Sequence, residues 1–154
     1  MRRRILAVTR TDKKIAELAN RTNHRKLAIW AADCAERVLP YFEGRSPDNR
    51  PRKAIEATRA WAQTGVFKMA NVRRAALAAH AAAREVEEYS AARSAARAAG
   101  QALATAHVPR HAIAAAIYAA TAVRDATNSS DADAATIKER NWQYQHLLEL
   151  TENS

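Results

Sequence analysis

The sequence predicts an all-α fold, a compact bundle of about six to seven helices with an alanine-rich central hairpin. Alanine, the residue with the highest helix propensity, supplies 39 of the 154 residues. Only three glycines and four prolines interrupt the chain. Apolar residues recur with the period of a helix, and no longer stretch alternates with the period of two that is typical of strands.

Two helices are predicted in the first part of the chain. One covers about Asp12 to Asn20, with Thr11 as its N-cap. The other begins after Asn23 and is expected to kink or end at Pro40, because proline has no N–H for the helical ladder. Its apolar stripe has helical spacing and consists of Leu27, Trp30, Ala31, Cys34, Val38 and Tyr41.

The next three helices include the alanine-rich hairpin. A helix begins at Pro51, a residue favoured in the first turn, and ends at Gly65; Ile55, Thr58, Trp61 and Ala62 share one of its faces. Residues 69–88 and 90–107 then form the hairpin, in which small side chains allow the two backbones to approach closely. The predicted inner faces are Val72, Ala76, Ala79, Ala83 and Val86 on one helix, and Ala95, Ala99, Ala102, Leu103 and Ala106 on the other.

Two further helices complete the predicted bundle. One covers residues 109–127 after the break at Pro109, and it presents Ile113, Ile117 and Ala120. A turn follows, in which Ser130 and Asp133 form a pair similar to a capping box. The last helix carries an apolar face of Ile137, Tyr144 and Leu148.

The net charge of +9 is concentrated at the N-terminus. Residues 1–26 carry nine basic and two acidic residues, whereas the remaining 128 carry sixteen basic and fourteen acidic ones. We therefore divide the chain into a basic arm with a short helix, 1–26, and a single helical domain, 27–150. The arm is either a contact for phosphate or an acidic partner, or a solubilising terminus. Its basic residues are Arg2, Arg3, Arg4, Arg10, Lys13, Lys14, Arg21, Arg25 and Lys26.

The sequence predicts a cytoplasmic location. The single cysteine, Cys34, excludes an intramolecular disulfide and suits a reducing compartment. The apolar run that follows Arg4 is too short for a signal peptide or a membrane span.

Five polar residues form a candidate cluster at the junction of the second helix with the alanine hairpin: Asp33, Arg37, His80, His107 and His111. Groups beside an alanine-lined interface have few large neighbours, so we expect them to pair with one another. We expect a structural network without metal or cofactor, since Pro109 separates His107 from His111 and no zinc motif is present.

Trp142 is the candidate for partner binding. It lies about 140° around the last helix from Ile137 on the helical geometry of 100° per residue. It therefore packs sideways on another helix or is exposed, and exposed tryptophan is enriched in binding hot spots.

Five segments together resemble the immunity-protein-five-like family of bacterial polymorphic toxin systems. They are LAIWAADCAERVLPYFE at 27–43, RPRKAIEATRAWAQTG at 50–65, RRAALAAHAAARE at 73–85, ARAAGQALATAHVPRHAIAAAIYA at 96–119 and ERNWQYQHL at 139–147. The resemblance implies an all-helical protein that neutralises a toxin, and it brings no catalytic residues. The chain has Gly100-Gln101 where a glycine-histidine pair is typical of the family.

The leading hypothesis is therefore a protein-binding module rather than an enzyme, whose partner is a toxin or another protein. Glycine-rich phosphate loops and nucleophile elbows are absent from the sequence. Two alternatives stay open. One is nucleic-acid binding through the basic arm, and the other is a metal-dependent hydrolase that uses Asp33 and the histidines.

Overall fold

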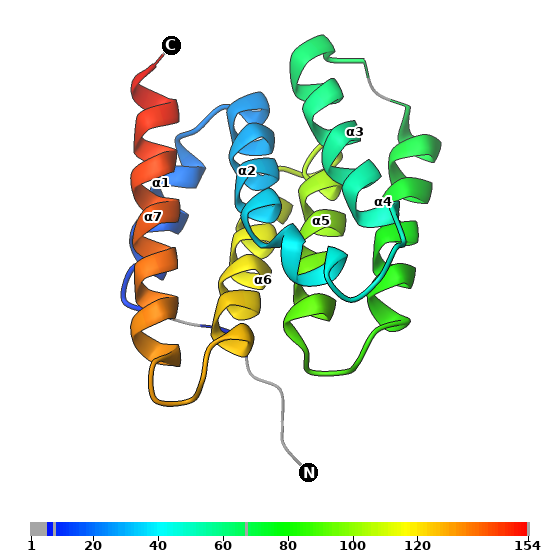
Figure 1. The fold of residues 1–154 in the computed structure, drawn as a ribbon. Helices are drawn as coiled ribbons and strands as arrows, with labels where there is room; N and C mark the ends of the chain where they lie inside the picture. Colours follow the sequence, from blue (N-terminus) through cyan, green and yellow to red (C-terminus); the bar gives the residue numbers. More distant parts are fainter. Residues whose placement is uncertain (1–5, 8, 67, 154) are drawn as a thin grey trace.

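The computed structural model describes residues 6–7, 9–66 and 68–153, and these contain seven α-helices and no strand, which confirms the predicted all-α fold. Figure 1 shows the helices as one bundle, with α7 at one edge and α4 at the other. The helices are α1 (Asp12–Asn20), α2 (His24–Glu43), α3 (Arg50–Thr64), α4 (Met69–Arg84), α5 (Ala91–Ala104), α6 (His111–Ala126) and α7 (Ala132–Glu152).

The central helix is α5, which packs against α2, α3, α4 and α6. Most of its buried residues are alanines, and Gly100 is buried with them. Such small side chains allow four neighbouring backbones to approach one helix, which a face of leucines would prevent. Most of the larger core side chains come from the other helices and include Ile15, Trp30, Phe42 and Ile55.

Most of the helix boundaries follow the signals in the sequence. Asn23 caps α2, because its side chain accepts a hydrogen bond from the backbone N–H of Lys26. Gly65 ends α3 with a φ of 73°, in the left-handed region that favours glycine. Thr11 holds the N-cap position of α1, but its side chain makes no capping hydrogen bond.

Three boundary predictions need correction. The second helix does not end at Pro40, which was one of the two outcomes predicted there, but continues to Glu43, so the proline lies inside its last turn. The helix that was predicted to reach residue 88 ends at Arg84. The pair of Ser130 and Asp133 does not cap α7: the hydroxyl of Ser130 donates to the Asn128 side chain instead.

The buried face of α6 includes Ala120, as predicted, but otherwise differs from the prediction. Ile113 and Ile117 are only half-buried, whereas Ala112, Ala115 and Ala116 are fully buried. The reason is the close packing of α6 on α5. Where two alanine-rich helices approach closely, the isoleucines are displaced to the margin of the contact.

The inner face of α7 is polar, which was not predicted. Ile137, expected in the core, is 49% exposed, and Tyr144 and Leu148 are half-buried. The fully buried Arg140 points inward, and its guanidinium bonds the Asp12 carboxylate of α1 at 2.7 Å. The buried face of α7 consists of Thr136, Glu139, Arg140, Gln143 and Leu147.

Candidate functional site

One surface gathers charged and aromatic side chains from three helices, and we call it the α2–α7 surface. Its residues line an open hollow: Asp33, Glu36 and Arg37 of α2, Arg59 of α3, and Trp142 and His146 of α7. Asp33 and Arg37 are one helical turn apart, and so are Trp142 and His146. Two residues one turn apart on α2 therefore face two residues one turn apart on α7.

Asp33 connects the three helices. Its Oδ1 accepts a hydrogen bond from Nη1 of Arg59 at 2.7 Å, and its Oδ2 lies 2.6 Å from Nε2 of His146. Because an ionised carboxylate only accepts hydrogen bonds, this contact places a proton on Nε2 of His146. The carboxylate thus fixes the position of one side chain from α3 and one from α7.

Arg37 is held in one orientation by two partners. Its Nε and Nη2 donate to both carboxylate oxygens of the buried Glu139, at 2.8 and 2.9 Å. The hydrogen bond to Glu139 raises the pKa of Arg37 above its usual value. The guanidinium carbon also lies 3.8 Å from the centre of the Trp142 ring, in a cation–π contact. The Arg37 side chain nevertheless stays 42% exposed.

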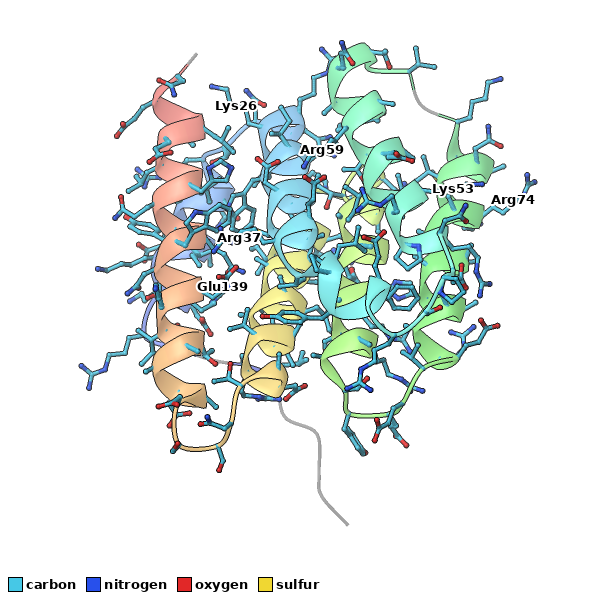
Figure 2. All side chains as sticks on the ribbon, in the orientation of Figure 1. Lys26, Arg37, Lys53, Arg59, Arg74 and Glu139 are labelled. Atoms are coloured by element: carbon cyan, nitrogen blue, oxygen red, sulfur yellow. The ribbon has the colours of Figure 1, made fainter. Side chains whose placement is uncertain are left out.

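The Trp142 ring continues this stack. It lies nearly parallel to the His146 imidazole, with the ring centres 4.8 Å apart. A second hollow adjoins the first on α2 and α7, and Arg37 and Trp142 line both hollows. The same second hollow is lined by Tyr41, which is 39% exposed instead of buried in the stripe predicted for it. Figure 2 shows Arg37 and Glu139 facing each other between α2 and α7.

The five residues of the predicted polar cluster form two separate groups, which corrects the expected arrangement. His80, His107 and His111 lie close enough to influence one another, but Asp33 and Arg37 have other partners. Asp33 and Arg37 pair with Arg59, His146 and Glu139 as described above. His80 lies elsewhere: its Nδ1 is 3.1 Å from Nη1 of Arg97 on α5. The physical reason is that the packing of α3 and α7 on α2 brings hydrogen-bonding partners within reach of Asp33 and Arg37.

The three histidines of the predicted cluster lie beside or just after α5. Burial, followed by the nearby charges of Arg97 and Arg84, lowers the pKa of His80 to about 4. Burial also lowers the pKa of His111, whose Nδ1 lies 2.8 Å from Oε1 of Gln101. His107 is exposed in the turn after α5. His80 is therefore a neutral side chain of the helix interface.

The environment of Cys34 does not favour a role as a nucleophile. Cys34 is fully buried, and burial raises the pKa of its thiol well above the usual value. A thiol in that state supplies little thiolate for nucleophilic attack.

The basic arm is only partly described. Arg2, Arg3 and Arg4 lie outside the described residues. The other basic residues are exposed, except for Lys26, which is half-buried. In addition, α1 is packed against α7, so that the basic residues of α1 project from the bundle itself.

Sequence reasoning identified three residues of the α2–α7 surface, Asp33, Arg37 and Trp142, but missed their partners. His146 follows Trp142 by four residues, a spacing that could have placed both on one face. No comparable signal pointed to Arg59 or Glu139. Glu139 lies 102 positions from Arg37 in the chain, and only the packing of α7 on α2 brings the two together.

Two features are absent from the described residues. In this part of the chain no three histidine, cysteine, aspartate or glutamate side chains are grouped so that they could hold a metal ion. Over the same residues, none of the helices has the length and apolar run needed to cross a bilayer.

Comparisons with known proteins point to one family. Searches among curated proteins and among solved structures gave no significant match. The family model described as Imm-5 like putative immunity protein matches residues 17–150, which include all of α2 to α6 and nearly all of α7. The match spans most of the chain, and the chain therefore belongs to the Imm-5 like putative immunity protein family.

Proposed function

We propose that this chain neutralises a protein toxin by binding it, without catalysis, through the α2–α7 surface. Membership of an immunity-protein family supports a protein partner. The observation that carries the choice of surface is the pair formed by Arg37 and Trp142, which stands between two hollows.

The chemistry of this pair suits protein binding. Arginine and tryptophan are enriched among residues that contribute most to protein interfaces. The fork to Glu139 and the stack on His146 fix both side chains before a partner arrives. Binding then costs little side-chain entropy, which otherwise amounts to about 0.5–1.5 kcal/mol per immobilised side chain.

The surface offers polar groups of both signs around the aromatic ring. Glu36 is exposed, and the Arg59 side chain is 37% exposed although it also pairs with Asp33. A partner can therefore be recognised by a mixed set of donors and acceptors, with the Trp142 ring as the apolar centre. This arrangement resembles a polar rim around an interface core.

The test first requires a toxin that the chain can neutralise. Coding segments that flank the gene of this chain are screened for growth arrest in a bacterial host, and the chain is then co-expressed with the arresting segment. We expect growth to be restored, and we expect Trp142→Ala to weaken the complex by about tenfold or more, as for a hot-spot residue.

Trp61→Ala is the matched control, because Trp61 is also a half-buried tryptophan but packs on His24 of α2, away from the proposed contact. Its complex should keep an affinity within about twofold of wild type. If Trp142→Ala and Trp61→Ala bind the toxin equally well while both stay folded, the choice of surface is wrong. If no co-expressed segment is neutralised, the function itself is refuted.

A further inference from the structure

The outer face of α4 is a second surface with an unusual composition. This helix lies at the edge of the bundle and packs mainly on α3 and α5. Its inner face is lined with alanines, and Ala76, Ala79 and Ala83 are buried there. The opposite face has no neighbouring helix.

Three arginines and one leucine dominate that outer face: Arg73, Arg74, Leu77 and Arg84. At 100° per residue, these four side chains fall within a sector of about 100° on the helix surface, with Leu77 near its middle. Leu77 is 59% exposed, although leucine is usually buried. Figure 2 shows Arg74 extending from α4 away from the bundle.

These arginines lack the partners that other arginines of the bundle have. Arg37, Arg52 and Arg59 on α2 and α3 each bond a carboxylate within 3 Å. In contrast, no carboxylate of the described residues pairs with Arg73, Arg74 or Arg84. For Arg73 and Arg74 the sequence explains the difference, because it contains no aspartate or glutamate between Glu56 and Glu85.

We propose that the outer face of α4 is a docking surface for an acidic protein segment that carries an apolar side chain at its centre. Unpaired guanidinium groups attract carboxylates, and complementary charge both accelerates association and selects the partner. The exposed Leu77 favours a protein over a nucleic acid, because phosphate groups offer no apolar surface against which a leucine side chain could pack. The surface is distinct from the α2–α7 surface and does not depend on it.

The test uses a fluorescent helical peptide with a face of glutamates around one leucine, and fluorescence anisotropy with the full-length chain. The double substitution Arg73→Glu/Arg74→Glu should weaken peptide binding by about tenfold or more, because it turns attraction into repulsion. Lys13→Glu/Arg21→Glu is the matched control: it changes the net charge equally, at exposed positions of α1 and the residue after it. The control should alter binding by about twofold or less, as expected of long-range charge alone in physiological salt.

Leu77→Asn tests the apolar centre and should weaken binding by about threefold without changing its dependence on salt. Thermal melting of each variant shows that the loss is not unfolding, since all of these side chains are exposed. Equal losses in the two double variants would mean that the peptide senses only net charge, and the proposal would fall. It would also fall if the peptide did not bind, or if duplex DNA bound the same arginines more tightly than the peptide.

Discussion

The contact between Gly100 and His80 gives a sharp test of the packing at the centre of the bundle. A Cβ atom placed on Gly100 would lie 2.7 Å from Nε2 of His80, 2.9 Å from Cε1 and 3.0 Å from Cδ2. The imidazole cannot move freely, because Arg97 contacts its other nitrogen. Gly100→Ala should therefore push the ring out of its place.

Two opposing effects set the magnitude. Replacing glycine by alanine inside a helix normally stabilises it by about 1 kcal/mol. Forcing an extra carbon into a packed interface costs about 1–3 kcal/mol. We expect Gly100→Ala to destabilise the protein by as much as about 2 kcal/mol, with the sign reversed from the usual effect of this substitution.

Urea denaturation of four proteins measures this: wild type, Gly100→Ala, His80→Ala and the double variant. Without the ring, the helical preference of alanine should be recovered, so the double variant should be more stable than His80→Ala by about 1 kcal/mol. If Gly100→Ala is stabilising to the same degree with and without His80, the ring does not pack on Gly100, and the reasoning is refuted.

Three further predictions concern the core. Arg140→Met should lower the free energy of unfolding by about 3 kcal/mol, because Asp12 loses its buried partner; a denaturation midpoint equal to wild type would contradict the pairing of α1 with α7. Ala79→Leu or Ala99→Leu should cost about 1–3 kcal/mol, since both alanines are fully buried at the hairpin contact. If both melt at the wild-type temperature, these positions do not lie at a close helix contact. The contribution of His80 to stability should be complete above about pH 6.5 and should be lost as the pH falls towards 4, because the lowered pKa of His80 means that protonation favours the unfolded chain. His80→Gln should remove that part of the pH dependence. An unchanged pH profile would show that His80 is not its cause.

Part of the α2–α7 surface could be predicted from the sequence. Trp142 was identified because its position did not fit the apolar stripe of its helix, and it does pack sideways against Arg37 of α2. Asp33 was identified as a polar residue beside an apolar stripe, but the sequence gave it the wrong partners. A carboxylate pairs with the nearest hydrogen-bond donors, and Arg59 and His146 become near only when α3 and α7 pack on α2.

The sequence by itself determined where most of the helices lie. Alanine favours helix at every position, Asn23 supplies a cap and Gly65 supplies the left-handed residue that ends α3, and all of these act over a few residues. Only the tertiary structure decided which faces are buried in α6 and α7. An alanine-rich helix such as α6 is apolar on every side, so its periodicity does not select a face. The inner face of α7 depends on Asp12, a residue 128 positions from Arg140, and a contact over that distance exists only in the folded chain.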